Sequence, residues 1–387
     1  FSVGFTVNTQ GFGTTTVTAY GLESKQQPAK VFNIEPQVVS VEPTSGTVGT
    51  VVTILCTGYA IGETVNVAFG TNASIQQAAA GTYGSFTTSF TIDVQGFGTT
   101  TITASGATTS GVSVATNVFS IQPQVVSVEP TAGTVGSVVV IYGTGYAAGE
   151  TVNIAFGTNA SIQQAAAGTY GSFTTSFTVD IQRFGTTTII ASGVSMATNV
   201  FSIQPQVVSV VPSAGTVGTI VTIYGTGYAA SDNINVVFGT NASIQQATAG
   251  TYGSFTTSWT VDVQVYGTTT ITASGVSVAT NVFNIQPQVV SVEPTAGTVG
   301  TIVTIYSTGY AAGDNINVAF GTNASIQQAA AGQYGSFTTS FTIDVQAYGI
   351  TTVAASGISV ATNVFNIQPQ VVSVVPTAGT VGTIVTI

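Results

Sequence analysis

The chain has 387 residues, of which 44% are apolar and only 4% are charged, and its formal net charge is −10. This apolar content is sufficient for packed cores and excludes a wholly disordered chain. Its three basic residues, Lys25, Lys30 and Arg183, form no patch that would neutralise phosphates, so we expect no nucleic-acid partner. The sequence has no long apolar run and no basic amphipathic stretch, so we expect no membrane contact within these residues.

An internal repeat organises the chain. The segment Gln-Pro-Gln-Val-Val-Ser-Val recurs at intervals of 82 residues, with its proline at Pro123, Pro205, Pro287 and Pro369. A further copy begins at Pro36 and runs for 87 residues, because five extra residues lie around Gly106–Ser110 in a Gly/Ser/Thr segment. An insertion of this composition predicts a surface turn.

The repeat also predicts the domain organisation. We expect four complete immunoglobulin-like repeats, at 36–122, 123–204, 205–286 and 287–368. Residues 1–35 match only the last part of a repeat, and residues 369–387 match only its beginning. The two end pieces together lack the middle of a repeat. We therefore expect that the sequence is a window from a longer chain. The alternative is that its ends complete a neighbour by strand exchange.

Short segments rich in β-branched and aromatic residues follow one another through each repeat. In the second complete repeat we predict strands, in chain order, at Val125–Val128, Val138–Tyr142, Thr151–Phe156, Ser161–Ala166, Ser172–Ile181, Thr186–Ala191 and Val200–Ile203. Gly, Pro and Asn separate these segments, and no helical periodicity persists for two turns. About seven short strands in roughly 80 residues are typical of a β-sandwich. The predicted fold class is all-β: tandem immunoglobulin-like β-sandwich repeats of 82 residues that form a rod.

The segment Ser172–Ile181 shows the clearest alternation. Phe173, Phe177, Val179 and Ile181 alternate with Ser, Thr and Asp, so we expect one face of this strand to be buried and the other to be solvated. Between repeats, the sequence Phe-Ser-Ile-Gln-Pro-Gln contains no Gly/Ser-rich spacer. Consecutive repeats are therefore expected to pack end to end as a stiff rod.

The start of each repeat resembles a known family. From Pro130, two glycines (Gly133 and Gly136) precede an aliphatic strand that ends in the turn Gly-Thr-Gly145-Tyr. The same pattern recurs from Pro43, Pro212 and Pro294, and partly from Pro376. It resembles the opening of IPT/TIG immunoglobulin-like domains, which occur in surface receptors, transcription factors, accessory modules of carbohydrate enzymes and prokaryotic surface proteins. The basic loops of the DNA-binding members and the disulfides of the receptors are missing here. What remains resembles long repetitive prokaryotic surface and appendage proteins.

The single cysteine, Cys56, excludes an intrachain disulfide. The other repeats have Gly143, Gly225 and Ser307 at its position. This comparison predicts a small buried side chain rather than a reactive thiol.

The chain offers little for catalysis. It has no histidine, which removes the usual general base and the commonest zinc ligand, so we expect no enzyme, no catalytic residue, no metal and no cofactor. Carboxylates recur singly, as Glu63, Glu150, Asp232 and Asp314 and as Asp93, Asp180, Asp262 and Asp344. We expect a turn or edge-strand solubility role for them. The alternative is a calcium site to which Asp232-Asn233 or Asp314-Asn315 would contribute.

Aromatic pairs recur beside these segments, such as Tyr170 with Phe173 and Tyr252 with Phe255. Paired aromatic side chains are able to form sugar-stacking platforms. Their spacing fits positions in the core and at the edge of a turn, and we expect core packing.

An Asn-Ala-Ser motif occurs in every complete repeat, at Asn72, Asn159, Asn241 and Asn323. Asn-x-Ser is the acceptor motif for N-glycosylation, and each copy lies between two predicted strands. N-linked glycans are the attached groups that we expect, because they would solubilise a chain with few charges. The alternative is an asparagine present for its turn geometry.

The repeats and the motifs favour a structural function. We expect an extracellular or cell-surface protein, a subunit of a glycosylated filament or appendage that assembles with copies of the same chain. Near-identity between repeats favours this, because a polymer requires the same task of every unit. The alternative is a rigid spacer or stalk of a surface adhesin or carbohydrate-binding protein. A third hypothesis, an accessory module of a secreted carbohydrate enzyme, requires a catalytic domain outside these residues.

Overall fold

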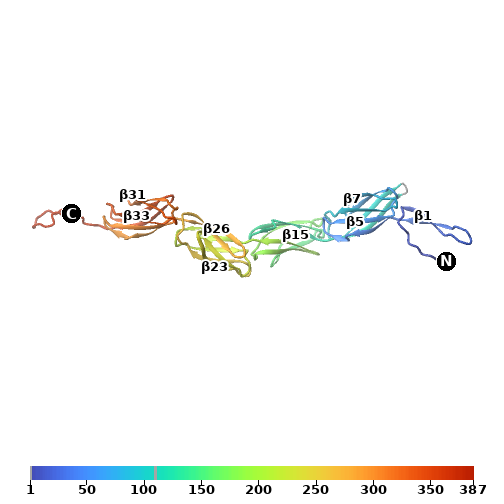
Figure 1. Cartoon of the computed structure of the whole chain (residues 1–387), viewed down its shortest axis with the longest axis horizontal. Helices are drawn as coiled ribbons and strands as arrows, with labels where there is room; N and C mark the ends of the chain where they lie inside the picture. The colour runs from blue at the N-terminus through green and yellow to red at the C-terminus, as the bar shows by residue number, and fades with distance from the viewer. Residues whose placement is uncertain (1, 109–110) are drawn as a thin grey trace. The chain divides into compact units, whose positions relative to one another are not determined.

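A computed structural model describes residues 2–108 and 111–387 of the chain. All of its regular elements are β-strands, and they form a series of β-sandwiches (Figure 1). The predicted all-β fold of tandem immunoglobulin-like repeats is confirmed. We refer to residues 36–122, 123–204, 205–286 and 287–368 as repeats 1 to 4. Among the described residues, no helix has the length and apolar character that are required to cross a bilayer.

Repeat 2 shows the architecture of every repeat. Its strands are β11 (Gln124–Glu129), β12 (Ala132–Gly133), β13 (Val138–Thr144), β14 (Thr151–Phe156), β15 (Asn159–Ala166), β16 (Phe173–Thr178), β17 (Gly185–Ser192) and β18 (Met196–Ile203). One sheet has three strands in the order β11-β13-β16, and the other has five in the order β12-β18-β17-β14-β15. The three-stranded sheet is antiparallel throughout.

The other repeats have the same strand order in both sheets. Repeat 1 consists of β3 (Gln37–Glu42), β4 (Ser45–Gly46), β5 (Val51–Thr57), β6 (Thr64–Phe69), β7 (Asn72–Ala79), β8 (Phe86–Thr91), β9 (Gly98–Thr108) and β10 (Gly111–Ile121). Repeat 3 consists of β19 (Gln206–Val211), β20 (Ala214–Gly215), β21 (Ile220–Thr226), β22 (Asn233–Phe238), β23 (Asn241–Thr248), β24 (Phe255–Thr260), β25 (Gly267–Ser274) and β26 (Val278–Ile285). Repeat 4 consists of β27 (Gln288–Glu293), β28 (Ala296–Gly297), β29 (Ile302–Thr308), β30 (Asn315–Phe320), β31 (Asn323–Ala330), β32 (Phe337–Thr342), β33 (Gly349–Ser356) and β34 (Val360–Ile367).

Two short strands precede repeat 1, β1 (Gly13–Thr18) and β2 (Ala29–Ile34), and they pair as an antiparallel hairpin. The predicted insertion in repeat 1 lengthens β9 and β10 to 11 residues each, against 8 in the matching β17 and β18. Residues 109 and 110 of that insertion lie outside the described residues. By its internal contacts the chain divides into two compact units, residues 1–180 with 186–202 and residues 181–185 with 203–387.

The predicted strand at Ser172–Ile181 is too long. The strand β16 ends at Thr178, and although Phe173, Phe177 and Val179 are buried as expected, Ile181 is 45% exposed. The next side chain, Gln182, is 4% exposed and takes the inward position. The alternation therefore ends where the chain leaves the sheet, and the prediction that Ile181 lies in the core is wrong.

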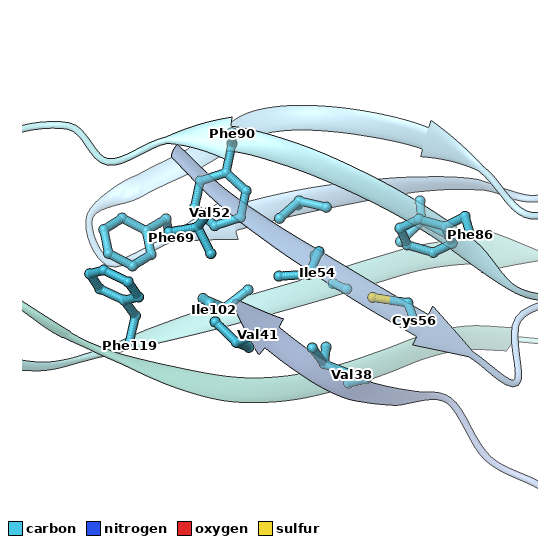
Figure 2. Close-up of a cluster of buried hydrophobic side chains, with 14 of the residues drawn as sticks. Val38, Val41, Val52, Ile54, Cys56, Phe69, Phe86, Phe90, Ile102 and Phe119 are labelled. Atoms are coloured by element: carbon cyan, nitrogen blue, oxygen red, sulfur yellow. The ribbon is translucent and has the colours of Figure 1, made fainter. Parts of the chain in front are cut away.

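The core of each repeat is apolar and aromatic. In repeat 1, Val52, Ile54 and Cys56 point inward from β5 between the two sheets (Figure 2). Cys56 has no exposed surface, and burial raises the pKa of its thiol to about 12, so the prediction of a small buried side chain is confirmed. The Phe69 ring lies 5.8 Å from Phe90 and 6.0 Å from Phe119, between centroids. Each such aromatic contact contributes roughly 0.5–1.5 kcal/mol beyond the area buried.

One tyrosine in each repeat connects the core to the end of the sandwich. In repeat 2 the Tyr146 hydroxyl donates to the Ala191 carbonyl at 3.1 Å, and its backbone N–H donates to the Gly171 carbonyl at 3.0 Å. A Cβ on Gly171 would lie 2.0 Å from the backbone carbonyl oxygen of Tyr146. The φ of Gly171, +70°, also favours glycine. Tyr146 and its equivalents Tyr59, Tyr228 and Tyr310 have no exposed surface.

These four tyrosines predict a loss of stability in alkali. Burial is the main factor that raises all four pKa values, that of Tyr310 to about 12, against about 10 in an unfolded chain. The unfolded chain therefore releases these protons at lower pH than the folded chain. Their contribution is complete below pH 10 and decreases as pH rises toward the folded pKa, by on the order of 2 kcal/mol per tyrosine by pH 12.

Urea unfolding measured from pH 8 to pH 12 checks this prediction. Substituting Phe at Tyr59, Tyr146, Tyr228 and Tyr310 lowers stability at pH 8 through the lost hydrogen bonds but flattens the dependence above pH 10. An equally steep alkaline loss in this variant would contradict the prediction.

Candidate functional site

The Asn-Ala-Ser motif of each repeat lies at the end of a tight β-hairpin. In repeat 1, Phe69 at the end of β6 pairs with Asn72 at the start of β7, which leaves a two-residue turn of Gly70 and Thr71. Gly70 has a φ of +54°, as expected for the first residue of a type II′ turn. The motif therefore begins at the first residue of the edge strand β7. The expectation that it lies in the turn between two strands is wrong, because Gly70 and Thr71 alone form that turn.

A polar network connects this asparagine to the loop after β8. The Asn72 side chain donates from Nδ2 to the Asp93 carboxylate at 3.1 Å, and Gln95 donates from Nε2 to the same carboxylate at 2.9 Å. Gln95 is only 5% exposed, and its amide also lies 3.3 Å from the Thr71 hydroxyl. The equivalent bonds in the next two repeats join Asn159 to Asp180 and Asn241 to Asp262.

The serine of the motif is also held by the fold. The Ser74 hydroxyl donates to the Asn66 side-chain oxygen, and Asn66 in turn donates to the Ala73 carbonyl at 2.8 Å. In repeat 2 the Ser161 hydroxyl lies 2.6 Å from the Asn153 oxygen. Both the asparagine and the serine of the motif thus have hydrogen-bond partners within the folded repeat.

The loop that carries Asp93 and Gln95 contacts the next repeat on its other side. The Phe97 N–H of repeat 1 donates to the Tyr146 carbonyl of repeat 2 at 2.9 Å. Phe12 donates to Tyr59 in the same way. In the second unit, to which the loop residues 181–185 belong, the equivalent bonds run from Phe184 to Tyr228 and from Tyr266 to Tyr310. We call this loop, residues 93–98 and their equivalents, the junction loop.

The side chains of the junction loop of repeat 4 are arranged differently. Tyr348 is 77% exposed there, against 39% for Phe97 and 37% for Tyr266. Asp344 accepts the backbone N–H of Val345 at 2.7 Å, while Gln346 bonds to Thr322 rather than to the carboxylate.

The second set of recurring carboxylates binds backbone groups. Glu150 accepts the N–H of Ala147 at 2.8 Å and that of Val194, and Asp232 accepts the N–H of Val276 at 2.8 Å. Glu63 is 6% exposed and additionally accepts the Ser113 hydroxyl. The expected turn role is present, but a solubility role is wrong for Glu63 because its carboxylate is buried. No group of three or more potential metal ligands occurs among the described residues.

The aromatic pairs separate into two environments. Phe173 and Phe255 are buried, as expected for core residues. Tyr170 and Tyr252 are 54% and 56% exposed, so the expectation of core packing is wrong for them. They lie in the turn that precedes β16 and β24, outside the paired strands of the sandwich.

Residues Asp93 and Gln95 were not linked to the asparagine by the sequence analysis. The pattern that would have linked them is Asp-x-Gln, which follows the asparagine by 21 residues in every repeat, as in Asp180-Ile-Gln182. A pair of polar residues that recurs at a strand end indicates a structural hydrogen-bond partner as readily as it indicates a reactive or ligand-binding group.

A scan against protein-family models finds no family that matches the chain, and a search of curated proteins finds no relative. Several solved structures of tandem domains are similar to it. A tetra-tandem repeat from the extending region of a large adhesion protein is 18% identical, with a TM-score of 0.23, over 86% of this chain and 98% of that one. The D1–D4 ectodomain fragment of ICAM-5 is 11% identical, with a TM-score of 0.22, over 86% and 99%. Invasin, a bacterial integrin-binding protein, is 12% identical, with a TM-score of 0.23, over 85% and 78%. At these identities the likeness concerns the fold alone and carries no argument about function.

The network predicts that the asparagine is structural as well as a candidate acceptor. In chain produced without N-glycosylation, substituting Ala at Asn72, Asn159, Asn241 and Asn323 removes the donor to the carboxylate where that bond is formed. The free energy of unfolding is expected to fall by about 1 kcal/mol per affected repeat. The measurement is urea unfolding followed by circular dichroism.

Substituting Ala at Ser74, Ser161, Ser243 and Ser325 is the matched control, because it destroys the same motif but keeps the asparagine. These hydroxyls are exposed, so a smaller loss is expected. Equal stability of the two variants would contradict a structural role of the asparagine.

Proposed function

We propose that this chain is a non-catalytic structural shaft of an extracellular or cell-surface assembly, in which each repeat is fixed to the next at a specific junction. The observation that supports this most directly is the recurrence of one junction geometry, a junction-loop N–H on the carbonyl of the buried tyrosine, as in Phe97 to Tyr146. Flexible tandem domains do not need the same hydrogen bond at each boundary. The tyrosine is itself bonded inside the core, so the junction is anchored on a rigid element.

The linker adds a second contact at the same junction. The Gln122 carbonyl and Pro123 pack against Gly145, where a Cβ would lie 2.4 Å from the carbonyl oxygen. The chain thus passes between repeats against the Gly-Thr-Gly-Tyr turn that also accepts the junction loop. Two contacts at different points restrict rotation more than a linker alone.

The finer parts of the proposal concern family, source and assembly. We propose that the repeats are of the IPT/TIG type and that the protein is prokaryotic, on the strength of the proline and glycine pattern that opens each repeat. A shaft is compatible with a self-assembling filament and with the stalk of an adhesin. We favour the filament, because near-identical repeats present the same surface along the chain.

Spin labels measure whether the junction is fixed. Gln77 and Gln164 are exposed on β7 and β15, and cysteines introduced there place one label on each of two consecutive repeats. Cys56 does not compete for the label, because it is fully buried. Double electron–electron resonance is expected to give a narrow distance distribution for the pair.

Phe97→Pro removes the donor of the junction hydrogen bond and is expected to broaden this distribution at least about twofold. Phe97→Leu keeps the N–H and is expected to leave the distribution narrow. A broad distribution in the unsubstituted pair, or no broadening in Phe97→Pro, would overturn the shaft proposal.

We also propose that Asn72, Asn159, Asn241 and Asn323 carry N-linked glycans, supported by their position at an exposed hairpin end. An N-linked asparagine retains one N–H, which is sufficient for its bond to the carboxylate. Mass spectrometry of peptides from native material is expected to show glycan masses on these asparagines. Unmodified peptides at all four positions would leave these asparagines with the structural role alone.

A further inference from the structure

A threonine hydroxyl lies against a buried glutamine amide at the hairpin end of repeat 1. The Thr71 Oγ1 lies 3.3 Å from Nε2 of Gln95 and 3.5 Å from its Oε1. The hydroxyl oxygen is therefore close to both heteroatoms of the amide, and the amide carbon is bonded to both. Thr71 lies in the turn between β6 and β7, whereas Gln95 lies in the junction loop, 24 positions later in the chain.

A carboxylate lies beside the same amide nitrogen. Asp93 Oδ1 accepts a hydrogen bond from Gln95 Nε2 at 2.9 Å, so this nitrogen contacts both the hydroxyl and the carboxylate. Gln95 is 5% exposed, so its side chain is largely protected from bulk water. Nucleophilic attack on an amide requires a nucleophile within reach of the carbon and a negative group beside the nitrogen that becomes positive. Both groups are present here.

The glycine of the turn allows the amide to approach this closely. A Cβ on Gly70 would lie 2.6 Å from Gln95 Oε1, so a larger residue would displace the amide. The matching Gly239 of repeat 3 has the same clearance from its own glutamine. In repeat 4, which has the same turn, the N–H and the hydroxyl of Thr322 both donate to Gln346 Oε1 at 3.2 Å. A backbone N–H on this oxygen stabilises the negative charge that develops when the amide carbon is attacked.

The same three residue types recur in the other repeats. In repeat 3, Gln264 is 3% exposed and donates from Nε2 to Asp262 at 3.2 Å, as in repeat 1. We do not extend the inference to repeat 4, where the Asp344 carboxylate accepts the Val345 N–H. The sets equivalent to Thr71, Asp93 and Gln95 are Thr158, Asp180 and Gln182 in repeat 2, and Thr240, Asp262 and Gln264 in repeat 3.

We propose that Thr71 and Gln95 become joined by an ester bond, as do the equivalent residues of repeats 2 and 3. Thr71 Oγ1 attacks the side-chain carbonyl carbon of Gln95, and a C–O bond forms while the hydroxyl proton passes to Nε2. The Cδ–Nε2 bond then breaks, and the nitrogen leaves as ammonia. Atoms and charge balance without an oxidant or a further reactant. Asp93 is the catalytic residue, because its carboxylate stabilises the positive charge on the leaving nitrogen.

The residue content of the chain favours this cross-link over the commoner ones. Its single cysteine excludes an intrachain disulfide, and residues 31–387 contain no lysine that would form an isopeptide bond. The ester would join the junction loop covalently to the β6–β7 hairpin. A cross-link of this kind stabilises a fold by restricting the unfolded chain. The bond lies within one repeat, so it does not depend on the proposed shaft function.

Mass spectrometry of the full chain, produced without N-glycosylation, tests the bond. Chymotrypsin cleaves the denatured chain after Tyr83, Phe86 and Phe90, and therefore separates Thr71 from Gln95 unless the two are joined. The expected result is one joined species, lighter than the sum of its two peptides by one ammonia. Hydroxylamine is expected to split this species, because it cleaves esters under conditions that leave peptide bonds intact.

Matched variants identify the reacting groups. Thr71→Val removes the hydroxyl with little change of shape, and only the joined peptide of repeat 1 is expected to disappear. Thr71→Ser keeps a hydroxyl and is expected to keep the joined peptide. Asp93→Asn is expected to slow the formation of the joined peptide after refolding at least about 100-fold. Circular dichroism checks that all three variants fold.

Separate peptides with the masses given by the sequence would overturn the proposal. A joined species that persists in Thr71→Val or resists hydroxylamine would also overturn it, as would its loss in Thr71→Ser or an unchanged rate in Asp93→Asn. Loss of ammonia from an unjoined 70–83 peptide would indicate cyclisation of Asn72 and would count against the ester. The junction is measured separately by the spin-label distances, so a failure of the ester is distinguished from a failure of the shaft.

Discussion

The buried tyrosine at the end of each sandwich is the interaction on which the rest of the structure depends. The Tyr146 ring packs 5.2 Å from Phe173, and its hydroxyl is bonded inside the core. Its N–H and carbonyl both project into the end of the sandwich, where they meet Gly171 and the junction loop. One residue therefore belongs to the core and to the contact with the preceding repeat.

The junction loop depends on contacts at both of its sides. Gln95 and Asp93 hold it to the hairpin of its own repeat, and Phe97 holds it to the next repeat. In repeat 4 the Asp344 carboxylate accepts the N–H of Val345. A glycan on the asparagine would lie beside a structural contact. Its effect on the junction would depend on whether the asparagine still donates its hydrogen bond to the carboxylate.

The sequence predicted the local elements better than the interactions between them. Thr151–Phe156 was predicted with the bounds that the structure has, because a valine, an isoleucine and a phenylalanine alternate with smaller or polar residues there. Ile181 was misplaced because the inward position at the strand end is taken by Gln182, a polar residue whose burial depends on partners that hydrophobic alternation does not reveal. The asparagine motif was expected in the turn between two strands, whereas it opens the second of these strands, as at Asn72 in β7. Its bond to a carboxylate 21 residues away was not foreseen, since the two residues meet only after the sheets have formed.

The scarcity of charge removes the usual protection from the exposed strand edge of each sandwich. An exposed β-strand edge tends to pair with other chains, and natural proteins commonly prevent this with lysine or other charges. The edge strand β15 has no charged residue and presents Asn, Ser and Gln instead, with Gln163 bonded to Thr175 at 3.3 Å. A glycan at its first residue would protect this edge sterically where charge does not.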